Sequence, residues 1–246
     1  MASQRITGRA GMSRAIAVFC RRASSVMSDS LHKIHGLLAD KAPVRWLFCG
    51  DSITHGFRHT WGHRDYTQHF AERVRSEMWR RRDIIINSAI SGNTSREVLA
   101  DFEWRVLQFR PHVVFLMIGM NDCAQSRKMS VREFTSNLGE FARRVQEDAG
   151  SLLVLQTSPP IIKGTTPDRE GTFPEFMDAV RSVAKSHGAV LVDHAEHWDR
   201  LAEKHALWMS DSYHPGPYGH VVLARSIFDR LGIHDPESNT GRLFVP

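Results

Sequence analysis

Five short apolar runs, separated by longer amphipathic stretches, constrain the fold of this chain more than any other feature. Between residues 65 and 82, Tyr66, Phe70, Val74 and Met78 recur at four-residue spacing, which predicts a helix. Runs that are apolar throughout are typical of parallel strands covered on both faces. Their alternation with helices predicts an α/β fold, a five-stranded parallel sheet between two helical layers. The expected strands are Val44–Cys49, Ile84–Asn87, Val113–Ile118, Leu152–Gln156 and Ala189–Val192, and the expected helices are Asp65–Arg82, Thr94–Phe109, Val131–Asp148, Pro174–His187, Ala195–Lys204 and Pro217–Leu231.

The 246 residues divide into one predicted domain and two terminal segments. No internal repeat or linker interrupts residues 43–235, so we expect one domain there, followed by a tail at 236–246. Residues 1–42 are expected to form a disordered or targeting extension. No apolar run approaches the roughly 18 residues that span a bilayer, so no transmembrane segment is expected.

The net charge of +5 is concentrated at the N-terminus. Residues 1–28 hold five arginines and no acidic residue, which leaves 27 basic and 27 acidic side chains beyond them. A neutral body gives little support for nucleic-acid binding. The arginine-rich segment has three possible interpretations: an organelle transit peptide, an extension without targeting meaning, or a translation start assigned too early. With three cysteines and no CxxC motif, the chain suits a reducing compartment, and a cytoplasmic location is favoured.

Polar residues follow three of the predicted strands, at the sheet edge where parallel α/β folds bind ligands. Ser52 comes just after the first strand, Gly92 lies in the turn after the second, and Asn121 follows the third. Serine attacks a carbonyl only when a neighbouring base activates it. A backbone N–H at glycine and an asparagine amide are suitable donors for a developing oxyanion. Each of these residues, taken alone, is also common in ordinary turns.

An Asp-x-x-His sequence before the last predicted helix provides the missing base. Asp211 precedes His214 by three residues, so a tight loop can bring the carboxylate to the imidazole. In acyl transfer, a histidine takes the serine proton, and a carboxylate fixes its tautomer. The sequence therefore predicts Ser52, His214 and Asp211 as a catalytic triad.

Together these blocks resemble the SGNH hydrolase family, also called GDSL esterases and lipases. The resemblance covers about residues 44–231, with isoleucine rather than leucine following the Gly-Asp-Ser block. It implies a three-layer, flavodoxin-like fold. It also implies an oxyanion hole formed by the Ser52 N–H, the Gly92 N–H and the Asn121 side chain. Asp51 and Asp122 are expected to be structural, holding Ser52 and Asn121 in place through loop amides.

The remaining features concern the substrate. His55, His59, His63 and Trp61 are expected to form a pocket wall, and the segment after the fourth strand (157–173) to form a polar lid or wall. Trp208 is expected either in the pocket or in the core. No metal or cofactor is expected, because the sequence places no carboxylate or thiolate near these histidines at ligand spacing.

The expected function is hydrolysis of carboxylic esters, with short acyl groups on a polar alcohol such as a carbohydrate. The alternatives are a lysophospholipase or thioesterase acting on longer acyl chains, and a non-catalytic binding module on the same fold.

Overall fold

A five-stranded parallel sheet forms the centre of the molecule. The computed structural model describes residues 29–201 and 205–246. The strand order is β2-β1-β3-β4-β5, and every neighbouring pair is parallel. The fold class expected from the sequence is therefore confirmed. The strands are β1 (Arg45–Gly50), β2 (Ile84–Asn87), β3 (Val113–Met117), β4 (Leu152–Gln156) and β5 (Val190–Val192).

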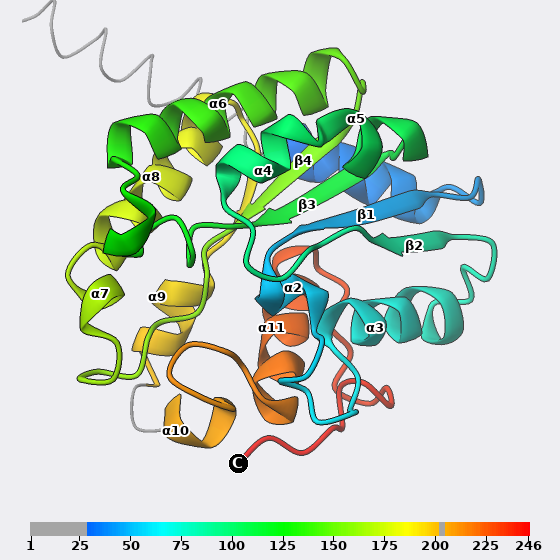
Figure 1. Ribbon diagram of the computed structural model, residues 1–246. Helices are drawn as coiled ribbons and strands as arrows, with labels where there is room; N and C mark the ends of the chain where they lie inside the picture. Colours follow the sequence, from blue (N-terminus) through cyan, green and yellow to red (C-terminus); the bar gives the residue numbers. More distant parts are fainter. Residues whose placement is uncertain (1–28, 202–204) are drawn as a thin grey trace, which may run out of the picture.

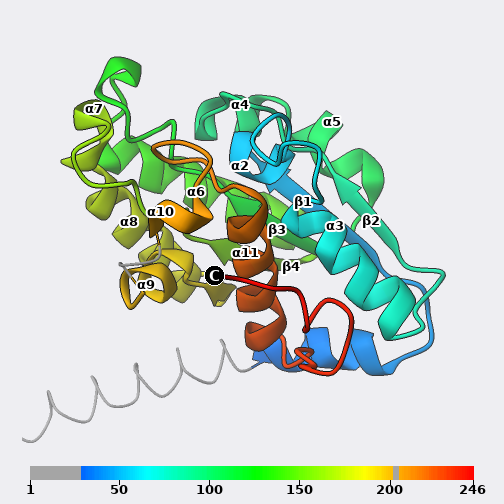
Figure 2. The same cartoon turned by 90° about the horizontal axis from the view of Figure 1, so that it is seen from below.

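Helices cover both faces of the sheet, as Figures 1 and 2 show. In Figure 1, α4, α5, α6 and α8 lie above the sheet, and α3 and α11 lie below it. The principal helices are α3 (Tyr66–Ala71), α4 (Ser95–Ala100), α6 (Val131–Glu147), α8 (Phe173–Ser186), α9 (His194–Asp199) and α11 (Pro217–Arg230). The shorter elements are α2 (Ser52–His55), η1 (Glu72–Glu77), α5 (Phe102–Arg105), η2 (Leu107–Phe109), η3 (Gln125–Arg127), α7 (Pro167–Glu170) and α10 (His205–Trp208).

Aromatic side chains fill the layer between the central strands and α3. Phe48 on β1 stacks on Phe115 of β3, with ring centroids 4.4 Å apart, and Phe70 of α3 packs edge-on against both. Each ring is fully buried. Burying a side chain of this size contributes about 1.5–3 kcal/mol, so the core fixes β1 beside β3. That pairing sets the position of the loops that follow the two strands.

Three predicted helices differ from the structure. The helix expected at Ala195–Lys204 corresponds to α9, which ends at Asp199, and residues 202–204 of that prediction lie outside the described residues. The predicted helix Asp65–Arg82 changes to π-helical geometry at Glu72–Glu77, and the predicted helix Thr94–Phe109 breaks at Asp101. The break at Asp101 has a physical reason, because it turns the fully buried Arg105 toward the strand ends. There its guanidinium donates to the carbonyl oxygens of Gly50 and Ser88.

Segments at both ends of the described chain pack against this body. Residues 29–39 form a helix whose Ile34 is fully buried, and Ser30 Oγ donates to the Gly188 carbonyl at 2.7 Å. The boundary expected after residue 42 therefore falls inside the folded body. Near the C-terminus, Thr240 donates to the Glu77 carboxylate through both its N–H and its hydroxyl. The arginine-rich residues 1–28 lie outside the described residues.

The described part of the chain contains no helix that is both long enough and apolar enough to cross a bilayer.

Candidate active site

The loop after β1 places Ser52 at the start of α2. Asp51 caps this helix, since its Oδ1 accepts from the Ile53 N–H at 3.0 Å. Gly50 makes the turn possible, because a Cβ there would lie 2.2 Å from the Met117 carbonyl oxygen of β3. Only glycine lets the two backbones approach so closely. The serine thus lies at the carboxyl end of β1, beside the central strand β3.

Ser52, His214 and Asp211 form a continuous chain of hydrogen bonds. Ser52 Oγ lies 2.8 Å from His214 Nε2, and His214 Nδ1 lies 2.8 Å from Asp211 Oδ2. A carboxylate only accepts hydrogen bonds, so Nδ1 carries the proton and Nε2 accepts from the serine hydroxyl. Burial is the largest influence on the His214 pKa and lowers it, although Asp211 opposes this. The imidazole is therefore neutral and available as a base at neutral pH.

Backbone contacts fix the loop that carries Asp211 and His214. Asp211 Oδ1 accepts from the N–H groups of Tyr213 and His214, at 3.0 and 2.9 Å. Ser210 N–H donates to the His214 carbonyl at 2.8 Å, which closes the turn. The carboxylate thus organises its own loop as well as the imidazole, and both contacts lower its pKa against the opposing effect of burial.

The two further oxyanion-hole candidates lie on loops beside the Ser52 loop. The Ile90 N–H donates to the Gly50 carbonyl at 3.1 Å, so the loop carrying Gly92 continues along the end of β1. Gly92 itself has a φ of 82°, in the left-handed region that glycine adopts easily. Asn121 Nδ2 donates to the Asn93 carbonyl at 2.9 Å. An amide nitrogen carries two hydrogens, so this bond orients the side chain and leaves one hydrogen for a ligand. That these groups converge on an oxyanion stays a prediction.

The two aspartates expected to be structural are fully buried and bind loop amides. Asp51 binds the Ile53 N–H, as described above, and Asp122 Oδ1 accepts from the Ser95 N–H at 2.7 Å. Asp122 therefore ties the Asn121 loop to the start of α4, a partner that the sequence did not reveal. Burial raises the pKa of Asp51 to about 7 and that of Asp122 to about 6.

Two residues near the site make contacts that the sequence did not predict: Arg105 had no assigned role, and His59 was expected only in a pocket wall. Arg105 also donates to Asn93 Oδ1, at 2.6 Å, so its guanidinium joins the loops after β1 and β2. His59 stacks on His214, and its Nδ1 lies 3.3 Å from Asp211 Oδ2. Neither contact follows from a local pattern, since each joins segments distant in sequence.

His59, Asp211 and His214 form a cluster whose ligand atoms lie within 4.8 Å of one another. Sequence spacing did not indicate this carboxylate, because only the fold brings Asp211 to His59. An imidazole nitrogen binds a metal along its lone pair, in the ring plane. The two rings are parallel to within 4° and stacked 3.6 Å apart, so they cannot both direct lone pairs at one ion between them. This arrangement is unsuited to a metal centre as it stands.

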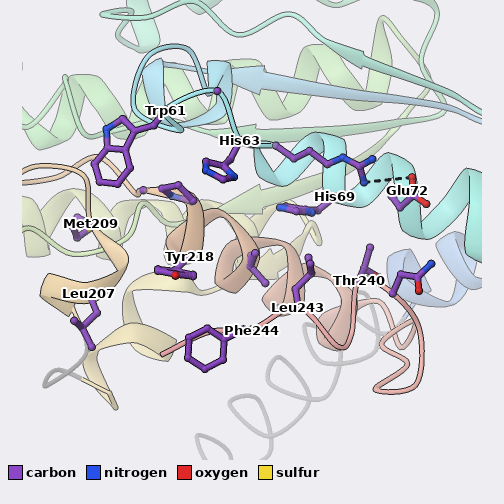
Figure 3. Close-up of a pocket in the computed structure, with 16 residues that line it drawn as sticks. Trp61, His63, His69, Glu72, Leu207, Met209, Tyr218, Thr240, Leu243 and Phe244 are labelled. Atoms are coloured by element: carbon purple, nitrogen blue, oxygen red, sulfur yellow. Dashed lines mark ion pairs between the residues drawn. The ribbon is translucent and has the colours of Figure 1, made fainter.

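Two cavities adjoin the loop that carries Asp211 and His214. A cavity of about 580 Å³ is lined by His59, Asp211 and His214 together with Trp61. A larger cavity of about 830 Å³ lies next to it, and Trp61 lines both. Figure 3 shows aromatic residues Trp61, Tyr218 and Phe244 around the larger cavity, together with Leu207 and Leu243. The predicted pocket wall around Trp61 therefore lines both cavities.

The segment after β4 packs on the His214 loop rather than standing apart from it. The Ile162 N–H donates to the Ser212 carbonyl at 2.8 Å, and the Arg169 guanidinium lies over the Tyr213 ring. The segment is thus a wall in the described conformation. Trp208 is 3% exposed and packs edge-on against Trp198, so of its two expected positions the structure shows the core.

Comparison with known proteins decides the family. The GDSL-like Lipase/Acylhydrolase family matches residues 48–222, which spans the Ser52 loop and the His214 loop. This chain belongs to that family. It is an ester-hydrolysing enzyme, and the resemblance seen in the sequence is confirmed.

Individual relatives agree with this assignment. The acetylxylan esterase of Geobacillus stearothermophilus is 26% identical over 162 residues, covering 60% of this chain and 72% of that protein. An uncharacterized protein of Mycoplasma pneumoniae is 28% identical over 158 residues, covering 62% of this chain but only 18% of the relative. Two solved structures, each 25% identical to this chain, are also similar. LAE5, an α/β hydrolase from the metagenome of Lake Arreo, has a TM-score of 0.68 over 78% of this chain and 96% of its own. The crystal structure of the Geobacillus esterase has a TM-score of 0.65 over 77% and 94%.

Proposed function

We propose that this GDSL-family enzyme hydrolyses short-chain acyl esters of a polar alcohol through an acyl-Ser52 intermediate. The observation that carries the proposal is the hydrogen-bond chain from Ser52 through His214 to Asp211. A serine hydroxyl at 2.8 Å from a neutral imidazole nitrogen has the base that it needs to become a nucleophile.

In the proposed mechanism, Ser52 Oγ attacks the ester carbonyl carbon while His214 Nε2 takes its proton. The negative oxygen of the tetrahedral intermediate accepts from the N–H groups of Ser52 and Gly92 and from Asn121 Nδ2. The intermediate collapses when the carbon–oxygen bond to the alcohol breaks and His214 returns the proton to the departing oxygen. A water molecule, deprotonated by His214, then releases the acid from Ser52. Asp211 stays ionised throughout and stabilises the imidazolium.

The position of the cavities supports a bulky alcohol portion. The departing oxygen must receive its proton from His214, so the alcohol leaves on the histidine side of Ser52. Both cavities lie on that side: His59 and His214 line the smaller one, and Trp61 lines both. Aromatic rings such as Trp61 and Tyr218 can stack on the C–H faces of a sugar ring. The relationship to an acetylxylan esterase favours the same class of substrate.

A longer acyl chain is the second candidate, because the larger cavity also contains aliphatic side chains. Leu207, Val221 and Leu243 line it, and Leu207 is 56% exposed. A lysophospholipase or thioesterase would use such a surface for its acyl chain.

Chain-length preference tests these two candidates. We expect kcat/KM on p-nitrophenyl esters to be highest for acetate and to fall through butyrate to octanoate. We also expect Tyr218→Ala, a change at a residue that lines only the larger cavity, to lower kcat/KM on an acetylated xylo-oligosaccharide but not on p-nitrophenyl acetate, whose small alcohol does not reach that cavity. Activity that rises with chain length, and is reduced on octanoate by Tyr218→Ala, would favour the lipid esterase instead.

The pH dependence follows from the His214 pKa. Only the neutral imidazole can take the serine proton, so kcat/KM should rise with pH and level off above the apparent pKa. Burial lowers that pKa below the ordinary histidine value, so half-maximal kcat/KM is expected at a lower pH than for a free imidazole. Initial rates between pH 4 and 9 measure this, with enzyme preincubated at each pH and re-assayed at pH 8 to exclude unfolding. A profile independent of pH across this range would contradict the role of His214 as base.

A further inference from the structure

The ring of His59 lies face to face with the ring of His214. The ring centroids are 3.6 Å apart and the planes differ by 4°. Parallel stacking this close brings the whole face of one ring against the other. His59 therefore covers one face of the imidazole that contacts Ser52.

The loop that carries His59 is held in an unusual conformation. Arg58 and Trp61, on either side of His59, have φ values of 70° and 51°, in the left-handed region that residues other than glycine rarely adopt. The buried hydroxyl of Thr60 donates to the Gly56 carbonyl at 3.0 Å and closes the loop from within. Backbone strain of this kind persists only where surrounding contacts hold it, and it is found mostly at functional sites. Its result here is the placement of His59 on His214.

His59 also approaches the carboxylate that His214 uses. Its Nδ1 lies 3.3 Å from Asp211 Oδ2, the same oxygen that lies 2.8 Å from His214 Nδ1. That oxygen is hydrogen-bonded to the His214 ring, and the His59 ring lies in a parallel plane. The His59 contact is therefore mainly electrostatic, and it becomes an ion pair only when His59 is protonated.

We propose that His59 is a positioning residue for His214, whose ring holds the catalytic imidazole in place and whose charge state decides whether that imidazole can be protonated during catalysis. Neutral His59 covers one face of the His214 ring and leaves the Asp211–His214 hydrogen bond undisturbed. Protonated His59 competes for Asp211 and repels the imidazolium that each acyl transfer requires. This inference rests on the proposed Ser52 esterase mechanism.

The surrounding charges are consistent with a neutral His59 at neutral pH. Burial lowers the His59 pKa, Asp211 raises it and Arg58 lowers it again. Burial is the main cause that lowers the His214 pKa, and Arg169 of α7 lowers it further; His220 of α11 is buried, and its pKa is lowered to about 3. In acid the two stacked rings oppose each other's protonation, so their titrations are coupled.

Two substitutions separate the effect of the His59 ring from the effect of its charge. His59→Phe keeps an aromatic ring on His214 but cannot be protonated, whereas His59→Ala removes both features. His234→Phe is the matched control, because His234 also lies beside an aspartate, with Nδ1 2.6 Å from Asp229 Oδ1, away from the site. Thermal melting of each variant establishes that it is folded.

We expect three results from kcat and kcat/KM measured between pH 4 and 9 on p-nitrophenyl acetate. His59→Ala should lower kcat at pH 8 by roughly two- to tenfold, the loss expected for one aromatic pair. His59→Phe should keep kcat at pH 8 within about twofold on the same scale. In both variants the acid limb should move to higher pH, because His214 loses a like-charged neighbour and its pKa rises. His234→Phe should match the wild type.

The outcomes distinguish this inference from the proposed function. An acid limb at the wild-type pH in His59→Phe would overturn the inference, even if kcat falls, because that variant keeps the covering ring and lacks only the charge. His59→Ala shifts the acid limb on either account, since removing the ring also exposes His214, whose pKa burial lowers. Failure of the proposed function would appear in the wild type, as absence of Ser52 labelling by a fluorophosphonate. If the wild type is labelled and active but the variants have the same pH profile as the wild type, only the role proposed for His59 is excluded, and the Ser52 mechanism stands.

Discussion

Replacing Ser52 by alanine should reduce ester hydrolysis by about 10⁶-fold, the loss typical of removing a triad nucleophile. Without Oγ no acyl-enzyme forms, and only the slow attack of water at an intact oxyanion hole remains. The substitution removes one oxygen from a site that is 8% exposed, so the fold should be retained. Turnover of p-nitrophenyl acetate by equal concentrations of wild type and variant measures the effect.

Ser91→Ala is the matched control for this substitution. Ser91 is an exposed serine on the neighbouring loop, and its Oγ lies 3.0 Å from His55 Nδ1 rather than from His214. It should keep wild-type turnover. If Ser52→Ala instead turns over esters as fast as the wild type, Ser52 is not the nucleophile.

Replacing Asn121 by alanine should lower kcat by roughly 10²–10³, the cost of one oxyanion donor. The amide is expected to donate to the oxygen only after it becomes negative, so KM should change little. Steady-state kinetics on p-nitrophenyl acetate separate the two parameters. Near-normal kcat would remove Asn121 from the mechanism.

The side chain of Asn121 also holds the Asn93 carbonyl, so a control for lost structure is needed. Asn137→Ala serves this purpose. Asn137 is a partly buried asparagine on α6, whose Nδ2 donates to Ser95 Oγ at 2.9 Å, away from the oxyanion site. A loss of kcat in Asn121→Ala but not in Asn137→Ala would indicate a role at the transition state.

Much of the fold follows from local patterns. The bounds of β2 and β4 agree with the prediction, because short apolar runs between polar turns have distinct ends. The helical break at Asp101 could not be predicted, because its cause is the burial of Arg105 against carbonyls 17 and 55 residues away. The helix at residues 29–39 was missed for a similar reason, since its partners at Gly188 and Leu231 are distant in sequence.

The candidate site likewise contains residues that sequence patterns predict and contacts that they do not. Ser52 and His214 could be predicted because one follows the first strand and the other lies in the last loop. Parallel α/β folds bind ligands at the sheet edge where these segments lie. His59 could be assigned only to a pocket wall, because its stack on His214 joins residues 155 positions apart, as their numbering shows. The contact with Asp211 likewise depends on a loop conformation that no spacing indicates.

Peptide mapping after fluorophosphonate labelling tests the central claim most directly. The account predicts one covalent adduct on Ser52 in the wild type, strongly reduced labelling in His214→Ala, and no adduct at this position in Ser52→Ala. An adduct on another serine, or ester hydrolysis that continues while Ser52 stays unlabelled, would contradict it.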